Sequence, residues 1–291
     1  MADLLNQAFI PAGFQELFAM WKRMGNAKLF AGGAEHLRNQ SGRIPILPEN
    51  IISLDKLEEL RRISRTERYL EIGAMVNLNQ IIRLGRIVPE VLIRCLENIA
   101  GPQVRSLATI GGNLCNPSPK LDCSAPMIAL DAQFELRTAK SARWISASRF
   151  SSLPGPPELA RHELMTRIRI PLNPWTFTKY YKFRTAGSNE PGGTILFIMQ
   201  NQKNVLTNIR VVYSGQIILR EKTGETMLEG KHLPLGKKDT AAFVDKWKAY
   251  LSVFEGNENS IFAGKDEHSH PELEKAQILN FIENTLMNIS E

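Results

Sequence analysis

The chain is most informative at residues 100–126, which read AGPQVRSLATIGGNLCNPSPKLDCSAP. Two adjacent glycines, Gly111 and Gly112, and several prolines interrupt any helical or strand period, so we predict a loop over residues 103–126. A loop of that length inside a compact domain is unusual unless it binds something. Its hydroxyl, amide and carboxylate groups suit a ligand with hydroxyls and a diphosphate, and they come from Thr109, Asn113, Asn116, Ser118 and Asp122. A plain polar surface loop would have the same composition, so both interpretations stay open on this segment alone.

A second glycine pair lies in LFAGGAEHL, residues 29–37. A short apolar strand over residues 28–31 is predicted to deliver Gly32 and Gly33 to a polar turn. Glycines let backbone N–H groups approach a ligand closely, and several such groups pointing one way bind an anion such as a diphosphate. Strand-glycine turns are also common without any ligand, so this motif alone does not decide between the two.

The flanking sequence predicts an N-terminal unit of βαβ type. Apolar residues recur at helical spacing in Phe14, Leu17, Phe18 and Trp21, which predicts a helix that ends near Gly25. A second strand is expected at residues 44–47, and a helix carrying Leu54, Leu57 and Leu60 follows.

The middle of the chain predicts further helices and strands. Residues 69–74, YLEIGA, indicate a strand, and Asn77 with Gln80 three residues later is typical of a capping box. A helix with one apolar face ends at Gly101, and strands are expected at residues 133–138, 142–145 and 164–170.

After a linker at residues 171–174 the pattern changes to strands followed by helices. Strands are predicted at residues 179–184, 194–199, 208–213 and 216–220, and helices at residues 240–251 and 271–288. This order favours an α+β domain with an antiparallel sheet.

Composition narrows the class of protein. The 291 residues are 43% hydrophobic and 23% charged, which is typical of a globular chain, and the N-terminus lacks the features of a secretory signal. No apolar run approaches the ~20 residues that span a bilayer, so we expect no membrane association and a cytoplasmic location. The net charge of +6 comes from scattered Lys and Arg, which argues against nucleic acid. Cys95, Cys115 and Cys123 show no metal-ligand spacing, so we expect reduced thiols and no metal site.

Taken together, the two glycine segments resemble the FAD-binding domain of the molybdenum hydroxylases, the family of xanthine dehydrogenase and of carbon monoxide dehydrogenase medium subunits. That family has a first loop of the form AGGTD, here AGGAE at residues 31–35, and a second of the form IRN-x-A-T-x-GGN, here VRSLATIGGN at residues 104–113. SPKLD at residues 118–122 follows the second loop as in the family. YLEIGA, ALDA at residues 129–132 and HELMTRIRIP at residues 162–171 extend the likeness over essentially the whole chain.

The resemblance implies an α+β fold: a two-part FAD-binding domain of the vanillyl-alcohol-oxidase type over residues 1–57 and 58–172, then a C-terminal domain over residues 175–291. It also implies a role for particular residues. The first loop is expected to hold the pyrophosphate, Ile99 to pack near the flavin or adenine, Asp122 to line the FAD site, and Lys182 to lie close to the flavin. The complete set of cofactor-binding residues is Leu29, Phe30, Ala31, Gly32, Gly33, Ala34, Glu35, His36, Ile99, Ala108, Thr109, Gly112, Asn113, Asn116, Asp122 and Lys182.

The function implied is electron relay, with no catalytic nucleophile or base in this chain. Molybdenum cofactor and iron–sulfur clusters are expected on partner subunits, and FAD here collects electrons for an acceptor such as NAD. The sequence departs from the family at Ala34, where a Thr hydroxyl is usual, and over residues 185–195, where the family has an acidic run and this chain reads TAGSNEPGGTI. In relatives the second of these segments lies near the flavin, so this departure bears on how the electron acceptor reaches the flavin.

Two alternatives belong to other classes. A stand-alone flavin oxidoreductase would need an acid or base facing the flavin, and the sequence nominates none. A cofactor-free assembly subunit would keep the fold without the flavin, and the departures at Ala34 and residues 185–195 make it conceivable. The flavin content of the purified protein distinguishes these alternatives.

Overall fold

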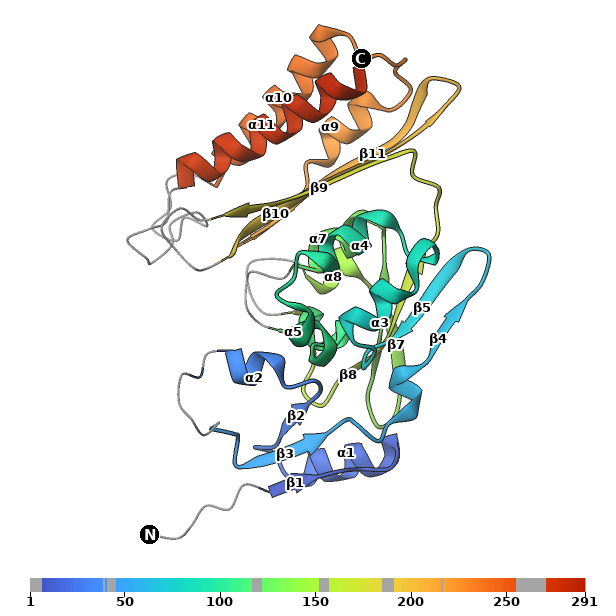
Figure 1. Cartoon of the computed structure of the whole chain (residues 1–291), viewed down its shortest axis with the longest axis vertical. Coiled ribbons are helices and arrows are strands. Elements are labelled where there is room, and N and C mark those ends of the chain that lie inside the picture. The colour runs from blue at the N-terminus through green and yellow to red at the C-terminus, as the bar shows by residue number, and fades with distance from the viewer. Residues whose placement is uncertain are drawn as a thin grey trace.

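A computed structural model describes residues 7–38, 40, 46–116, 122–151, 157–184, 191–215, 217–254 and 271–290. Three sheets follow one another along the chain (Figure 1). The first is a parallel sheet of order β1-β3-β2, in which α1 links β1 to β2 and α2 follows β2. The elements are β1 (Gln7–Phe9), α1 (Phe14–Arg23), β2 (Lys28–Phe30), α2 (Ala34–Arg38) and β3 (Asn50–Ser53).

Two predictions for this first unit were wrong. The third strand is β3, and Ile46 and Leu47 belong to no strand. Pro45 inside that predicted strand and Pro48 directly after it explain the error, since proline cannot donate to a ladder. The leucine-rich segment forms only a 3-10 turn, η1 (Glu58–Arg61), although its leucines are buried as expected. They pack with Leu17 and Ile52 in a small core of their own.

The second sheet is antiparallel and has the order β4-β5-β8-β6-β7. Side chains alternate along β5, so that Leu70 and Ile72 are buried while Glu71 lies on the other face. The buried face packs against the helices in the central core of the protein. The strands are β4 (Ile63–Arg65), β5 (Tyr69–Gly73), β6 (Gln133–Arg137), β7 (Ala142–Ser146) and β8 (Leu164–Pro171); the helices are α3 (Leu78–Arg83), η2 (Gly85–Ile87), α4 (Glu90–Glu97), α5 (Pro102–Leu107), α6 (Ile110–Leu114), α7 (Ser124–Ala129) and α8 (Ala147–Phe150).

The loop predicted over residues 103–126 is largely helical instead, because α5, α6 and the start of α7 occupy it. Pro102 sits at the start of α5, where its missing N–H costs nothing. Thr109 caps α6, and the glycine pair lies inside that short helix. Residues 117–121, which include Ser118, lie outside the described part. In this segment the proline marks the start of a helix and the glycines allow close contacts, so neither residue type indicates a loop.

The third sheet is antiparallel, of order β12-β11-β10-β9, and α9, α10 and α11 cover one of its faces (Figure 1). The other face packs on α4 and α7, so that Leu196, Ile198 and Val212 belong to the central core. The predicted strands and two of these helices are confirmed, and α9 was not predicted. Their bounds are β9 (Phe177–Arg184), β10 (Pro191–Gln202), β11 (Val205–Ser214), β12 (Ile218–Leu219), α9 (Lys222–Leu228), α10 (Lys237–Ser252) and α11 (Pro271–Ser290).

The mixture of helix and sheet confirms the α+β class. Within the described residues, none of the helices combines the length and the apolar character needed to span a bilayer.

Candidate functional site

The two glycine segments, distant in sequence, touch each other. A Cβ atom added to Gly32 would lie 1.6 Å from the carbonyl oxygen of Leu107, at the end of α5. A Cβ atom on Gly112 would lie 3.9 Å from the Cβ of Ala31. Figure 1 shows α2 and α5 facing each other where these segments meet. Glycine at position 32 is therefore required by the packing of one segment on the other.

The first segment is a turn with unused backbone donors. Gly33 has φ +71°, in the left-handed region, and a Cβ atom there would come within 2.3 Å of the Phe30 ring. That ring stacks on the imidazole of His36, with centroids 5.4 Å apart. Within the described residues the N–H groups of Gly32 and Gly33 donate to no acceptor. A tight turn with unpaired N–H groups is the arrangement that binds a phosphate group.

The second segment is held by its own hydrogen bonds. The Thr109 side chain accepts from the N–H of Gly112 at 3.1 Å, and the N–H of Gly111 donates to the carbonyl of Ala74 at 2.9 Å. A Cβ atom on Gly111 would lie 2.6 Å from the Cβ of Ala74. Gly111, which the sequence reasoning did not include among the site residues, thus brings α6 against the end of β5. Only the doubled glycine of the motif could have indicated it.

Arg105 fixes the turn before α5 and was also missed. Its Nη1 donates to the carbonyls of Glu97, Ile99 and Ala100 at 2.8–3.1 Å, and its Nε donates to Asn79 at 3.3 Å. Ala100 has φ +44°, so this turn is strained and needs such support. Ile99 itself is buried in the central core.

Asp122 and Lys182 form an ion pair between the middle of the chain and the C-terminal sheet. Nζ of Lys182 donates to the Asp122 carboxylate at 2.8 Å and to the carbonyl of Asn98 at 3.2 Å. Less than a fifth of either side chain is exposed. The ammonium of Lys182, expected to act beside the flavin, is therefore already neutralised by Asp122.

The surroundings of Asp122 connect this pair to the second glycine segment. The thiol of Cys95 donates to the Asp122 carbonyl at 3.1 Å, and the N–H of Cys123 donates to the side chain of Asn113 at 3.3 Å. Asn113 belongs to α6 and Cys95 to α4. Asp122 and Cys123 together thus connect α4, α6 and β9.

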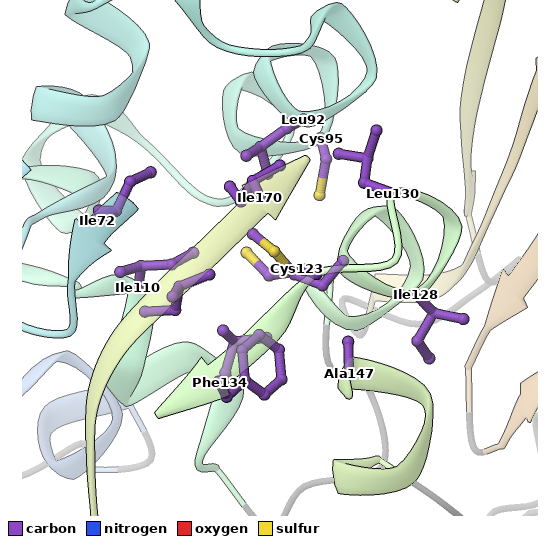
Figure 2. Close-up of a cluster of buried hydrophobic side chains, with 14 of the residues drawn as sticks. Ile72, Leu92, Cys95, Ile110, Cys123, Ile128, Leu130, Phe134, Ala147 and Ile170 are labelled. Atoms are coloured by element: carbon purple, nitrogen blue, oxygen red, sulfur yellow. The ribbon is translucent and has the colours of Figure 1, made fainter. Parts of the chain in front are cut away.

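The side chains beneath Asp122 are neutral. Cys95 and Cys123 are free thiols buried among apolar residues such as Ile110 and Leu130 (Figure 2). A hydrogen bond with Cys95 and burial hold the pKa of the Cys123 thiol well above its usual value. Burial likewise raises the pKa of Tyr180, whose hydroxyl has no partner in the described structure. Among the described residues no group of three or more His, Cys, Asp or Glu side chains could hold a metal ion, and both thiols pack in the central core.

The structure thus brings most of the predicted residues together. Leu29, Phe30, Ala31, Gly32, Gly33, Ala34, Glu35 and His36 form the end of β2 and the first part of α2. Ala108, Thr109, Gly112 and Asn113 lie opposite them, and Asn116 follows α6. Asp122 and Lys182 lie beside Asn113 and the end of α4. Residues 185–190 of the departing segment lie outside the described part.

Two facing glycine segments, one of them with N–H groups that donate to no described acceptor, have the arrangement expected of a protein that binds a phosphate-containing cofactor. Comparison with known proteins identifies the family. Residues 5–173 match the family described as the FAD-binding domain in molybdopterin dehydrogenase. The chain belongs to this family, and FAD is the cofactor of its domain.

Several relatives share this assignment. The xanthine dehydrogenase FAD-binding subunit of Escherichia coli O157:H7 is 32% identical over 155 residues, which is 51% of this chain and 51% of the relative. The carbon monoxide dehydrogenase medium chain of Hydrogenophaga pseudoflava is 30% identical over 230 residues, covering 76% of this chain and 79% of that one. The match therefore spans about half the length of the xanthine dehydrogenase relative and most of the medium chain.

Solved structures agree in fold. Carbon monoxide dehydrogenase from H. pseudoflava, in a form that lacks the Mo-pyranopterin moiety of its cofactor, superposes with a TM-score of 0.81 at 26% identity. The superposition covers 98% of this chain and 96% of that one. Quinoline 2-oxidoreductase from Pseudomonas putida 86 has a TM-score of 0.80 at 19% identity, and this shows the shared fold alone.

Proposed function

We propose that this chain is the FAD-binding electron-transfer subunit of a molybdenum-containing hydroxylase or dehydrogenase. It passes electrons from iron–sulfur clusters on one partner subunit, through FAD, to an acceptor such as NAD, while a further subunit holds the molybdenum. Bound FAD supplies a centre that accepts electrons singly or in pairs. The observation that carries the proposal is the turn at Gly32 and Gly33, with unpaired N–H groups, seated against the segment that contains Gly112.

In this proposal each part of the site has its own task. The N–H groups of Gly32 and Gly33 bind the diphosphate, and Thr109 with Asn113 orients the neighbouring ribityl region. Ile99 packs beside the ring system. Asp122 accepts a hydrogen bond from the cofactor with the oxygen that Lys182 does not use, and the pair keeps the local net charge near zero. Residues 1–57 and 58–172 are the two halves that enclose FAD, and residues 175–291 supply Lys182.

The electron-relay role is favoured over a stand-alone oxidase by the chemistry of the nearby groups. Tyr180 and Cys123 have raised pKa values, so neither is a ready base at neutral pH. His36 lies flat on Phe30. The relatives are named as a FAD-binding subunit and as a medium chain, which supports a partnered enzyme.

The test is flavin retention in a graded series of glycine variants. Gly32→Ala drives a Cβ atom into the Leu107 carbonyl and is expected to remove nearly all FAD. Gly112→Ala places its Cβ atom 2.9 Å from the Thr109 hydroxyl and in ordinary contact with Ala31, and this variant is expected to lose part of its FAD. Gly13→Ala is the control, because nothing lies within 4 Å of its Cβ. Circular dichroism on each variant separates cofactor loss from unfolding.

The cofactor and the relay are then checked on the unaltered protein. Denaturation is expected to release FAD, and release of FMN or of no flavin would contradict the proposal. Without partners the flavin-loaded chain is expected to show diaphorase activity, passing electrons from NADH through the flavin to artificial dyes, but to hydroxylate no purine. Hydroxylation by the single chain would show that it is a complete enzyme. Normal FAD content in a folded Gly32→Ala protein would place the diphosphate elsewhere.

A further inference from the structure

A cavity of about 680 Å³ lies along α4, away from the glycine segments. Its walls come from η2, the whole length of α4, the linker after β8, and single residues of β4 and β9. The apolar part of its wall is formed by Ile87, Val88, Val91, Ile93, Leu172 and Trp175. Cavities of this size that are lined mainly by apolar side chains are typical of sites for small organic ligands.

Three arginines line this cavity, and two of them have no ion pair with a described residue. Arg94 pairs with Glu90 at 3.5 Å, and Glu90 also accepts from Thr178 at 3.3 Å, so that carboxylate is satisfied. Arg65 and Arg86 are exposed lining residues, and neither has an ion pair with any described residue. Glu97 is the one unpaired carboxylate of the described lining, and it belongs to the last turn of α4. The lining therefore holds three arginines against two glutamates, and the dipole of α4 adds positive potential at its first turn.

Trp175 supplies a second, independent observation. The guanidinium of Arg210 covers its ring at 4.9 Å, which fixes the indole in the wall. Its Nε1 has no exposed surface, so the indole contributes an apolar surface to the cavity and no hydrogen-bond donor.

We propose that this cavity binds a small amphipathic anion, a carboxylate with an aliphatic or aromatic body. The carboxylate pairs with Arg65 and Arg86, and the body lies against Val88, Leu172 and Trp175. None of the cavity's lining residues belongs to the glycine segments, although the cavity follows α4 as far as Glu97, the residue before Asn98. Neither the proposed relay nor the family assignment requires this ligand.

Octanoate is the probe, titrated calorimetrically into the flavin-loaded chain. One equivalent is expected to bind, at least tenfold more tightly than inorganic phosphate or octan-1-ol, since phosphate lacks the apolar body and octan-1-ol lacks the charge. The double variant Arg65→Glu, Arg86→Glu is expected to weaken octanoate binding at least tenfold. The control Arg23→Glu, Lys140→Glu makes the same change of charge at two exposed positions outside the lining and is expected to bind as the parent does.

Three results would overturn the site: no saturable octanoate binding, phosphate binding as tightly as octanoate, or equal losses in the two double variants. Trp175→Phe gives a further check, because octanoate is expected to quench the parent's tryptophan emission and to leave that variant unchanged. FAD content is measured in the same samples. A protein that binds octanoate but no flavin would contradict the proposed relay and support the cavity site. A protein that binds flavin but no octanoate would support the relay and contradict the cavity site.

Discussion

Replacing Lys182 by Met tests the centre of the site, because it removes one partner of the Asp122 pair and keeps the length of the side chain. The bond is short, at 2.8 Å, and its partners are less than one-fifth exposed. Charge-assisted hydrogen bonds contribute about 1.5–3 kcal/mol, and a buried charge left alone costs about 3–5 kcal/mol. Since some exposure remains, we expect a loss of about 2–3 kcal/mol in the free energy of unfolding.

A double-mutant cycle isolates the pair. Asp122→Asn is expected to cost a similar amount, and the double variant less than the sum, with a coupling energy of about 1.5–2 kcal/mol. Urea unfolding of the four proteins, each with excess FAD, measures this. The control is the exposed Asp245–Lys248 pair, 3.4 Å apart, whose coupling is expected to stay below about 0.5 kcal/mol.

The same variants report on the flavin. Asp122→Ala is expected to weaken FAD binding roughly tenfold to a hundredfold, since ~1.4 kcal/mol corresponds to a factor of ten. Lys182→Met is expected to retain FAD and to lower its potential, because the Asp122 charge is then uncompensated and disfavours the reduced anion. Additive effects within about 0.3–0.5 kcal/mol would show that the pair is not a unit. Full FAD content in Asp122→Ala, or an unchanged potential in Lys182→Met, would refute the proposed roles.

Two further predictions concern the support of the site and its pH dependence. Arg105→Gln deprives three carbonyls of their donor, so it is expected to lower the free energy of unfolding by about 1–3 kcal/mol and to increase FAD loss on dilution. The control Arg94→Gln changes an exposed side chain and is expected to lower stability little. Equal shifts of the melting temperature in the two variants would refute this role of Arg105. The hydrogen bonds from Arg143 hold the pKa of buried Glu163 below its usual range, so this carboxylate stabilises the fold above about pH 4.3 and loses that effect as pH falls through its folded pKa. The stability difference between Glu163→Gln and the parent is therefore expected to be largest near pH 7 and to shrink on acidification, and a constant difference in urea midpoints from pH 7 to pH 3 would contradict the assignment.

The sequence predicts the fold well where a local pattern decides the structure. Alternating apolar residues in YLEIGA and continuous apolar runs in the C-terminal strands, such as residues 195–199, place β5 and the last sheet within a few residues of their bounds. Asn77 and Gln80 form the expected capping box. The family motif likewise identifies both glycine segments, because each one depends on a short run of residues.

The remaining features depend on contacts between distant segments. Gly111 inside α6 is explained only by Ala74, and Gly32 only by the Leu107 carbonyl, so local composition could not separate a loop from a short helix. The hydrogen bonds of Arg105 and the ion pair of Lys182 likewise depend on the folded arrangement of the chain, so no local sequence pattern predicts them. Lys182 was expected to act as a lone ammonium because its partner lies 60 positions away.

The predicted boundary near residue 174 marks a change of chain pattern, but the packing continues across it. Leu196, Ile198 and Val212 fill the same core as α4 and α7. Polar contacts also join the two sides of this interface. Thr178 donates a hydrogen bond to Glu90, and ion pairs join Lys182 to Asp122 and Arg210 to Asp131, the latter at 2.6 Å. Removing the C-terminal sheet would expose that apolar face and leave Asp122 without its cation. The flavin half and the C-terminal half therefore stabilise each other, and binding FAD against Asp122 is expected to strengthen the contact between them.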